Sequence, residues 1–309
     1  MEMKKLLFIF NPQSGSGEIC KRLAEVVDIF IKANYDVVVY STQAPGDGKK
    51  KILAEGKDFD RIVVAGGDGT LNELVNAVML LPKKVTVGYI PTGTVNDFAT
   101  AHNLPKNNVI AAAKIAVSDY VVDVDVGKFE NTYFSYVAAF GVATNVAYDT
   151  DQKAKKRWKF LAYFVNVVRS IVGPKKLKRA CRKMTVDTGE TVLKGEFIFG
   201  AISNSRSIGG VKNFTDKEAV LNDGLLEGLF IPRPKTLKDW DQLKKGFLSR
   251  DFASSGLAFV RAKKFEIRCE PTAWTLDGEN GGSHEHIVIT AYKQSLSVAL
   301  SDPDKTENA

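Results

Sequence analysis

The N-terminal part of the chain alternates short apolar runs with segments of helical length, and this order most constrains the fold. Four runs are strand-like, at residues 6–10, 37–40, 62–65 and 85–90. Continuous rather than alternating apolar runs are typical of strands that are buried on both faces. The first intervening segment has apolar residues at helical spacing, which would pack on a sheet: Ile19, Leu23, Val26, Val27 and Phe30. The pattern predicts an α/β layer structure with a mostly parallel sheet.

The second half of the chain has a different pattern. Apolar and polar residues alternate there, as in residues 265–270, and this alternation is typical of antiparallel strands with one buried face. Turn sequences lie at residues 187–189, 222–224 and 277–278, where hairpins would need them. The chain of 309 residues is long enough for two domains, so we expect a second, mostly β domain.

Composition excludes several classes of protein. Apolar residues at 44% and charged residues at 26% describe a globular rather than a disordered chain. The sequence has no apolar run of about 18 residues, and its first apolar stretch is too short for a signal peptide. The three cysteines, Cys20, Cys181 and Cys269, have no metal-type spacing, which suits a reducing compartment. We therefore expect a cytoplasmic protein.

Positive charge is concentrated in one segment. Residues 153–183 contain many lysines and arginines and no acidic residue, whereas the rest of the chain is slightly acidic. Such a surface favours a polyanionic neighbour, either nucleic acid or an anionic membrane face, although a solvated charged face is the alternative. Aromatic residues in this segment lie only within its apolar stretch, not interleaved as stacking platforms, which argues against nucleic acid.

Three loops that contain glycine follow three of the predicted strands. Gly66-Gly67-Asp68-Gly69-Thr70 connects a strand to a helix, and residues 11–17 and 91–98 follow the first and fourth strands. Glycine leaves backbone N–H groups accessible to a phosphate at the positive end of a helix. The alternative for the central loop is a tight turn whose aspartate caps the helix. Because the loops would meet at one edge of a parallel sheet, they predict a nucleotide site.

The complete set of motifs resembles the diacylglycerol kinase catalytic-domain family, in particular its bacterial soluble lipid kinases. The motifs occur in the same order as in that family: NPQSGSG, GGDGTLNE, PTGTVNDF, NDGLLEGLF and LDGE. The resemblance implies an N-terminal three-layer α/β domain at residues 1–127 that binds nucleotide. It also implies an antiparallel β-sandwich, lipid-binding domain at residues 128–292, with residues 293–309 returning to the first domain.

The resemblance also assigns an ATP site, across the cleft between the two domains. The implied nucleotide-binding residues are Asn11, Pro12, Gln13, Ser14, Gly15, Thr42, Gly66, Gly67, Asp68, Gly69, Thr70, Leu71, Asn72, Glu73 and Thr94. Several relatives have lysine where this chain has Ser16, so a lysine contact to phosphate is not expected from that loop.

Three carboxylates are the implied catalytic residues. Glu279, in the Leu276-Asp277-Gly278-Glu279 motif, would accept the proton of the lipid hydroxyl, which suits transfer of a phosphoryl group to an alcohol. Asp68 would bind Mg²⁺ or the acceptor hydroxyl, and Asp97 would assist at the phosphates or cap the helix that Phe98 begins. Without the family, Asp277 and Gly278 form only a hairpin turn, and Glu279 is a solvated residue.

A structural Mg²⁺ site is implied at a second position. Its ligands would be the carboxylate of Asp223 and the carbonyl groups of Val220 and Leu225. One carboxylate with carbonyls and waters suits Mg²⁺, which keeps part of its hydration shell. The alternative is that Asn222, Asp223 and Gly224 form only a turn.

One segment within the basic region reads as an almost entirely apolar helix, residues 158–172. Burial in the second domain is one interpretation. The other is contact with an acyl chain or the membrane interface, while residues 153–157 and 175–183 meet anionic headgroups.

The sequence therefore predicts an ATP- and Mg²⁺-dependent lipid kinase, with diacylglycerol as the leading substrate and phosphatidic acid as its product. The alternatives are a kinase of another amphiphilic or soluble alcohol, such as a sphingoid base or NAD, and a non-catalytic nucleotide- and membrane-binding protein. The expected partners are a lipid substrate and, through Lys153–Lys183, the anionic inner face of the membrane, to which the protein would be peripheral. No nucleic-acid partner is expected, and a homodimer is left open.

Overall fold

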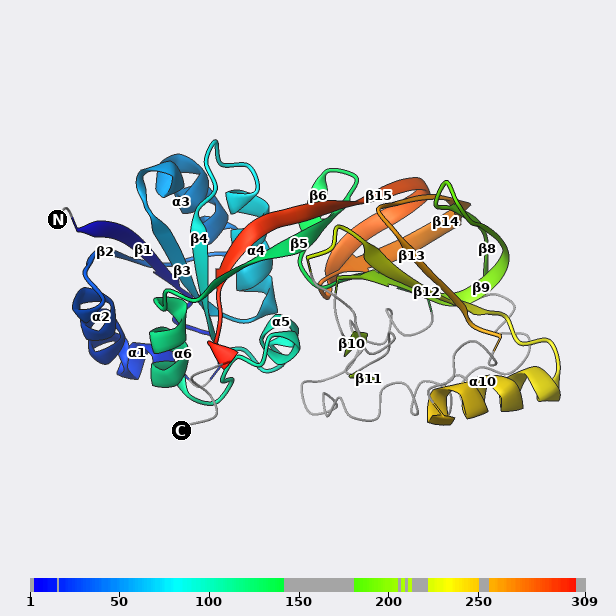
Figure 1. Cartoon of the computed structure of the whole chain (residues 1–309), viewed down its shortest axis with the longest axis horizontal. Helices are drawn as coiled ribbons and strands as arrows, with labels where there is room; N and C mark the ends of the chain where they lie inside the picture. The colour runs from blue at the N-terminus through cyan, green and yellow to red at the C-terminus, as the bar shows by residue number, and fades with distance from the viewer. Residues whose placement is uncertain are drawn as a thin grey trace. The chain divides into compact units, whose positions relative to one another are not determined.

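The computed structural model describes residues 3–15, 17–141, 181–204, 207–208, 211–212, 222–249 and 256–303. The chain divides into two compact units (Figure 1). Unit 1 comprises Met1–Val126 together with Lys293–Ala309, and unit 2 comprises Gly127–Tyr292. Unit 1 is therefore built from two separate stretches of the chain.

Unit 1 contains a parallel sheet. Its strands are β1 (Lys4–Phe10), β2 (Tyr35–Ser41), β3 (Arg61–Gly66), β4 (Thr86–Pro91) and the end of β15 (Glu279–Ala299). They lie in the order β15-β4-β3-β1-β2, and every pairing is parallel. Because parallel strands need crossover connections, helices follow β1, β2, β3 and β4 and cover the faces of the sheet. The parallel arrangement predicted for this part of the chain is confirmed.

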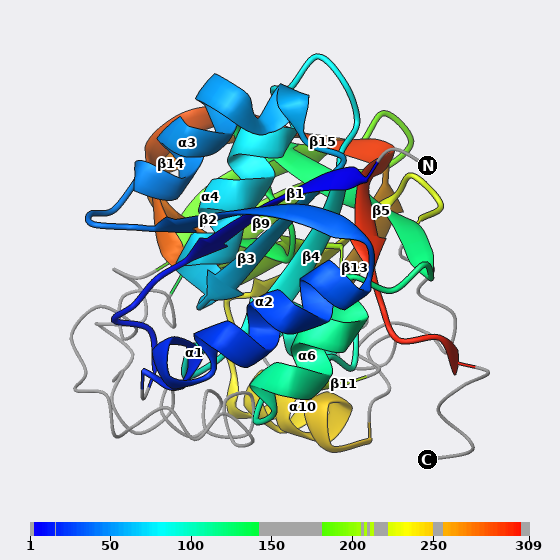
Figure 2. The same cartoon turned by 90° about the vertical axis from the view of Figure 1, so that its left-hand side faces the viewer.

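Helices cover both faces of that sheet (Figure 2). One face carries α1 (Glu18–Lys21), α2 (Leu23–Lys32) and α6 (Val109–Ala116), and its core includes the buried rings of Phe8 and Phe30. The other face carries α3 (Asp47–Glu55) and α4 (Asp68–Val78). The shorter elements of unit 1 are the 3₁₀ helix η1 (Gly56–Asp58) and α5 (Asp97–Ala101). Unit 1 is thus the three-layer α/β structure that the sequence predicts.

Strand β2 differs from the prediction that all four apolar runs are buried on both faces. Val38 is 40% exposed and Val39 is 41% exposed, although their side chains point to opposite faces. β2 is the last strand at its end of the sheet, so the flanking helices cover it less completely than the central strands. An apolar run alone does not distinguish a terminal strand from a central one.

Unit 2 is built from antiparallel strands. They are the end of β5 (Val121–Phe129), β6 (Thr132–Phe134), β7 (Val137–Gly141), β8 (Arg182–Asp187), β9 (Val192–Ser203), β12 (Leu226–Pro232), β13 (Ala258–Ala262), β14 (Lys264–Leu276) and most of β15. A short pair, β10 (Ser207–Ile208) and β11 (Val211–Lys212), and helix α10 (Leu237–Ser249) complete the described elements.

All described strands except β10 and β11 form one continuous sheet, rather than a parallel sheet and a separate sandwich. β8 pairs with the first part of β9 and β7 with its second part, and both strands also pair with β14. This arrangement closes the strands of unit 2 around a single core. The fold prediction is therefore corrected: most pairings in the continuous sheet are antiparallel, and the parallel ones are confined to unit 1.

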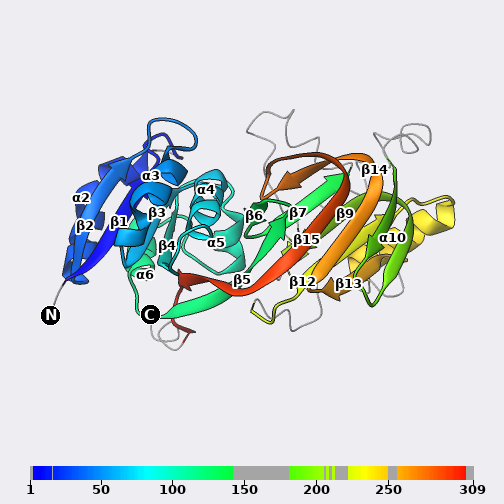
Figure 3. The ribbon, with the colours of Figure 1, turned by 90° about the horizontal axis from the view of Figure 1, so that it is seen from above.

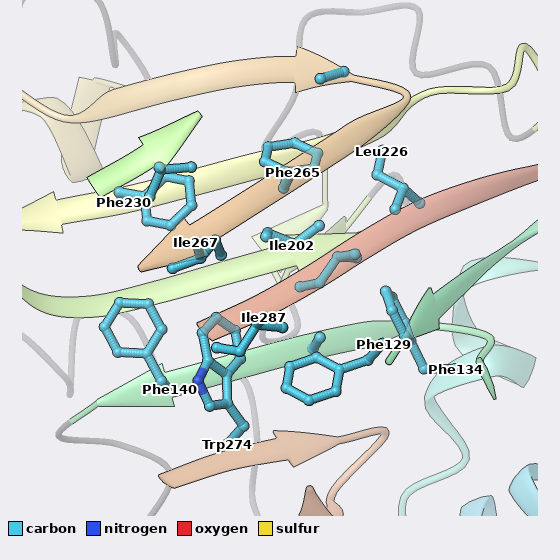
Figure 4. Close-up of a cluster of buried hydrophobic side chains, with 14 of the residues drawn as sticks. Phe129, Phe134, Phe140, Ile202, Leu226, Phe230, Phe265, Ile267, Trp274 and Ile287 are labelled. Atoms are coloured by element: carbon cyan, nitrogen blue, oxygen red, sulfur yellow. The ribbon is translucent and has the colours of Figure 1, made fainter. Parts of the chain in front are cut away.

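Large aromatic side chains fill the core of unit 2 (Figure 4). Phe129 and Phe140 lie against Trp274, with ring centroids 5.3 and 4.9 Å from the indole. Gly127 makes room for such a ring, because a Cβ atom there would lie 2.1 Å from the Phe134 ring. The alternating pattern of these strands thus builds a well-filled core on their inner face.

The last strand, β15, runs from unit 2 into unit 1 (Figure 3). Ser297 and Val298 pair with Thr86 and Val87 of β4, and the Ser297 hydroxyl donates a hydrogen bond to Asp123, 2.5 Å away. The C-terminal segment is therefore a strand of the sheet in unit 1. In the part of the chain that the structure describes, no helix is long and apolar enough to cross a membrane.

Candidate active site

The loops after β1, β3 and β4 meet at one edge of the sheet in unit 1. The Thr92 hydroxyl donates to the Ser14 hydroxyl at 2.9 Å, and the Thr92 amide donates to the Gly66 carbonyl at 2.9 Å. The Asn11 amide donates to the Ala65 carbonyl at 3.0 Å. Each of the three loops is thus hydrogen-bonded to another, as their positions after parallel strands predict.

Glycine is required where these loops touch. Gly15 has φ +62°, and a Cβ atom there would lie 2.1 Å from the Thr92 carbonyl oxygen. A Cβ atom on Gly93 would lie 2.5 Å from the Cα atom of Gly67. Gly66 is buried, and a Cβ atom there would collide with the Thr70 side chain. These glycines serve loop packing, whereas Gly67, Gly69 and Thr70 remain partly exposed and accessible to a ligand.

Asp68 connects the central loop to the loop after β4. Its two carboxylate oxygens accept hydrogen bonds from the backbone amides of Asn96, at 2.9 Å, and Asp97, at 2.7 Å. Asp68 therefore binds the amides at the start of α5, so the helix-capping role considered for Asp97 belongs to Asp68. The predicted role of Asp68 in binding Mg²⁺ or the acceptor hydroxyl stays a prediction.

Two buried residues that the sequence did not single out complete this junction. Asn96 is 1% exposed and has φ +53°, and its side-chain amide donates to the Gly93 carbonyl at 2.7 Å. The Tyr89 hydroxyl lies 3.2 Å from the Gly66 carbonyl and 3.1 Å from Asn96 Oδ1. Burial raises the pKa of Tyr89, as do the charges of Asp68 and Asp97, so the hydroxyl stays a donor. The sequence signal for Asn96 is its residue type, because asparagine adopts positive φ more often than most other non-glycine residues.

Glu73 and Thr42 hold a fourth loop in place. Glu73 Oε1 accepts a hydrogen bond from the Gly46 amide at 2.7 Å, just before α3 begins. The Thr42 amide and hydroxyl both donate to the Phe10 carbonyl, at 3.0 and 3.4 Å. Leu71 is 2% exposed, so its side chain belongs to the core rather than to a ligand site. These contacts assign structural roles to residues predicted as ATP contacts.

The remaining predicted nucleotide residues lie around the same edge. Asn11 Oδ1 accepts a hydrogen bond from the Gln13 amide at 2.9 Å, which shapes the first loop, and the Pro12 carbonyl faces the Cys20 sulfur. Thr94 is exposed at the tip of its loop. Asn72 accepts hydrogen bonds from the buried side chain of Asn76.

A cavity of about 250 Å³ opens between these loops. It is lined by Ser14, Gly15, Glu18, Pro91, Thr92, Gly93, Lys106, Asn107 and Val109. The Lys106 ammonium group donates to the Thr100 hydroxyl at 2.6 Å, and no described carboxylate forms an ion pair with it. Lys106 therefore brings positive charge to a polar cavity beside the glycine loops. Sequence reasoning missed it because a lone lysine in a loop has no motif around it.

Glu279 lies in unit 2, at the hairpin between β14 and β15. It is paired with Leu276 across the two-residue turn of Asp277 and Gly278, and it is exposed. Asp277 itself is partly buried, and its carboxylate accepts hydrogen bonds from residues 135–137. The turn predicted from the sequence is confirmed, and Asp277 is an anchoring residue that the prediction missed.

The described part of the second metal motif fits Mg²⁺ poorly. Asp223 Oδ2 lies 2.6 Å from Arg261 Nη2, and Asp223 Oδ1 accepts a hydrogen bond from the Leu225 amide at 2.9 Å. The guanidinium group already supplies the positive charge that a metal would bring. Among the described residues no cluster of three or more metal-ligating side chains occurs. Val220 lies outside the described residues, so the ligand set of Val220, Asp223 and Leu225 stays a prediction.

Other predictions also fall outside the described residues. They concern Ser16, the apolar helix at residues 158–172 and nearly all of the basic segment at residues 153–183.

Comparison with known proteins gives consistent results. A family model described as the diacylglycerol kinase catalytic domain matches residues 5–129. A diacylglycerol kinase of Staphylococcus aureus strain MRSA252 is 31% identical over 99% of this chain and 98% of its own length. A diacylglycerol kinase of Bacillus subtilis strain 168 is 29% identical, covering 94% and 95% of the two chains. The crystal structure of a diacylglycerol kinase from Bacillus anthracis strain Sterne has the same fold, with a TM-score of 0.78, 24% identity and 99% of both chains covered.

Proposed function

Because the chain belongs to the diacylglycerol kinase family, and is thus a lipid kinase, we propose that it uses ATP and Mg²⁺ to phosphorylate diacylglycerol to phosphatidic acid. The observation that carries this proposal is the interlocked set of loops after β1, β3 and β4. A kinase needs rigid backbone donors around the phosphates and little else from the protein, because catalysis of phosphoryl transfer is mostly positioning and charge stabilisation.

Several features of unit 1 support nucleotide binding at these loops. Gly67 and Gly69 are partly exposed at the start of α4, where the helix dipole favours negative charge. Lys106 adds a cation beside Ser14 and Gly15. Glu18 also lines this cavity, so the accessible glycine backbone and the start of α4, rather than the charge of the cavity, favour a polyphosphate over an uncharged ligand.

Glu279 is the proposed base. It would accept the proton of the lipid hydroxyl as that oxygen bonds to the γ-phosphorus and the bond to the leaving ADP oxygen breaks. Mg²⁺, when bound with the nucleotide, would neutralise charge on the transferred group. Asp68 and Asp97 would orient the reacting groups in the nucleotide-binding loops. The carboxylate of Asp68 accepts a hydrogen bond from the backbone amide of Asp97 and so holds it in place.

Association with a membrane is a further part of the proposal. The substrate lies in a bilayer, and the basic segment at residues 153–183 would bring the enzyme to an anionic inner face. Sedimentation with vesicles of zwitterionic and anionic lipids tests this. Binding that does not depend on anionic lipid, or that persists after neutralising Lys175, Lys176, Lys178 and Arg179, would contradict it.

The decisive experiment gives the protein labelled ATP, Mg²⁺ and a total lipid extract, and identifies the labelled product. We expect label in phosphatidic acid, extracted into the organic phase, and only a small residual amount with the Glu279→Gln variant. Label in an aqueous product would indicate a soluble alcohol, and label in a sphingoid phosphate would indicate another lipid. A folded wild type that phosphorylates no lipid would favour a non-catalytic nucleotide-binding protein.

A further inference from the structure

The turn that precedes Glu279 is a tight hairpin with an unusual backbone. Asp277 has φ +50° and Gly278 has φ +91°, as two-residue hairpin turns require. Leu276 and Glu279 pair directly on either side of the turn. Glu279 is therefore the first residue of β15, and the conformation of the turn determines where its Cα atom lies.

The carboxylate of Asp277 fixes this turn to a neighbouring segment of unit 2. Oδ2 accepts from the Ser135 amide at 2.8 Å and the Ser135 hydroxyl at 3.1 Å. Oδ1 accepts from the amides of Tyr136 and Val137, both at 2.9 Å, and the Asp277 amide donates to the Val137 carbonyl at 2.8 Å. Three successive backbone amides thus converge on one ionised group, which makes each hydrogen bond stronger than a neutral one.

Glu279, by contrast, has no such support of its own. Its side chain is exposed, and no hydrogen bond or ion pair joins it to any residue in the described part of the chain. Its carboxylate is therefore placed by the backbone of the turn alone. A small displacement of a catalytic group has a large effect on rate, since roughly 1 Å can cost about 100-fold.

We propose that Asp277 is a positioning residue, which holds the β14–β15 turn on residues 135–137 and thereby fixes Glu279 for proton transfer. This inference rests on the proposed function, in which Glu279 is the base. Asp277 does not itself contact the substrate, because both of its carboxylate oxygens are engaged by unit 2.

Substitution of Asp277 by asparagine tests the proposal. In Asp277→Asn, an amide NH₂ group replaces one acceptor oxygen and faces backbone N–H groups. We expect kcat to fall roughly 10- to 100-fold, while KM for ATP changes by less than about twofold, because the nucleotide loops belong to unit 1. The matched control is Asp187→Asn, in the β8–β9 turn, where the Gly189 amide, at 2.8 Å, is the only donor to Asp187 Oδ1 within the described part of the chain. This control should keep the wild-type kcat.

A double variant separates positioning from a merely structural role. If Asp277 acts only through Glu279, the Asp277→Asn/Glu279→Gln double variant will have the same residual rate as Glu279→Gln alone. If the rate of the double variant is instead lower than the wild-type rate by the product of the two single-variant reductions, the proposal is wrong.

Two other outcomes are informative. Wild-type kcat in Asp277→Asn, with Glu279→Gln inactive, would overturn the positioning role alone. Wild-type kcat in Glu279→Gln would overturn the assigned base and the positioning role together. If Asp277→Asn does not fold, Ser135→Ala removes a single hydrogen bond and should lower kcat about threefold at unchanged KM. An unchanged kcat in that variant would also overturn the proposal.

Discussion

Several carboxylates in the sequence motifs bind backbone amides of a distant segment. Asp68 binds Asn96 and Asp97, and Glu73 binds Gly46. A carboxylate that accepts hydrogen bonds from part-buried backbone amides stabilises the folded chain as well as serving a ligand site. The residue types expected for phosphoryl transfer therefore also hold the loops in place, and substitutions should affect both stability and activity.

Asp68→Asn is expected to lower both the melting temperature and kcat. The amide group would place a donor against the part-buried amide of Asn96 or Asp97, which costs about 1 kcal/mol, the lower end of the range for a buried unsatisfied group. Thermal unfolding of the wild type and the variant without nucleotide measures the first effect, and turnover measures the second. A variant with wild-type stability and no activity would show that Asp68 serves only the ligand.

Glu227 makes stability depend on pH. Glu227 is 1% exposed, and burial raises its pKa to about 7. Its Oε1 lies 3.4 Å from Arg261 Nε, and the same arginine also pairs with Asp223. Between the ordinary pKa of 4.5 and about 7, the folded state keeps a proton that the unfolded state has lost. The free energy of unfolding therefore falls as pH rises through this window.

Glu227→Gln should remove that dependence. We expect the melting temperature of the wild type to fall more steeply than that of the variant between pH 5 and 8, since glutamine stays neutral. Thermal unfolding across this pH range, in buffers of equal ionic strength, provides the measurement. Parallel curves for the two proteins would show that Glu227 does not titrate there.

At the scale of elements, periodic patterns made most of unit 1 predictable. The apolar residues of the sequence predict β1, β3, β4 and α4. They do not predict the break between α1 and α2, because the helical spacing of apolar residues continues across Arg22. The glycine loops were also predictable, but their contacts were not. Ser14 and Thr92 are 78 residues apart, and only the order of strands in the sheet brings them together.

The loop between α5 and α6 contributes Lys106 to the proposed nucleotide site. Lys106→Met should raise KM for ATP about tenfold, equivalent to about 1.4 kcal/mol of binding, by removing a charge beside Ser14 and Gly15. Little change in melting temperature is expected, because the side chain is exposed. Lys114→Met, on the exposed side of α6, is the matched control and should keep the wild-type KM. Equal KM values for both variants would exclude Lys106 from the site.

The turn before β12 is expected to be stable without a divalent cation. Asp223 is neutralised by Arg261, so adding Mg²⁺ or EDTA should not shift the melting temperature of the nucleotide-free protein. Arg261→Gln should have a lower melting temperature than the wild type. Mg²⁺ should not raise the melting temperature of this variant by more than it raises that of the wild type. Stabilisation of the wild type by Mg²⁺ that is lost in Asp223→Asn would instead support the predicted metal site.

At the scale of the whole molecule, the chain leaves unit 1 in β5 and returns to it in β15. Unit 1 therefore contains the predicted nucleotide loops from the first part of the chain and a strand from the last part. A single long strand contributes to two cores. Leu296, which is 2% exposed, belongs to unit 1, and Ile287, which is fully buried, belongs to unit 2.

Truncating each of these side chains should weaken a different unit. Leu296→Ala and Ile287→Ala each remove comparable buried volume, which costs about 2–5 kcal/mol. Hydrogen exchange should then increase mainly in β4 and its neighbours for Leu296→Ala, and mainly in β14 for Ile287→Ala, because opening free energies differ between cooperative units. Leu296→Ala should also weaken nucleotide binding, although residue 296 lies about 200 positions beyond the glycine loops. Equal increases in exchange in both units with either variant would show instead that the chain unfolds as a single cooperative body.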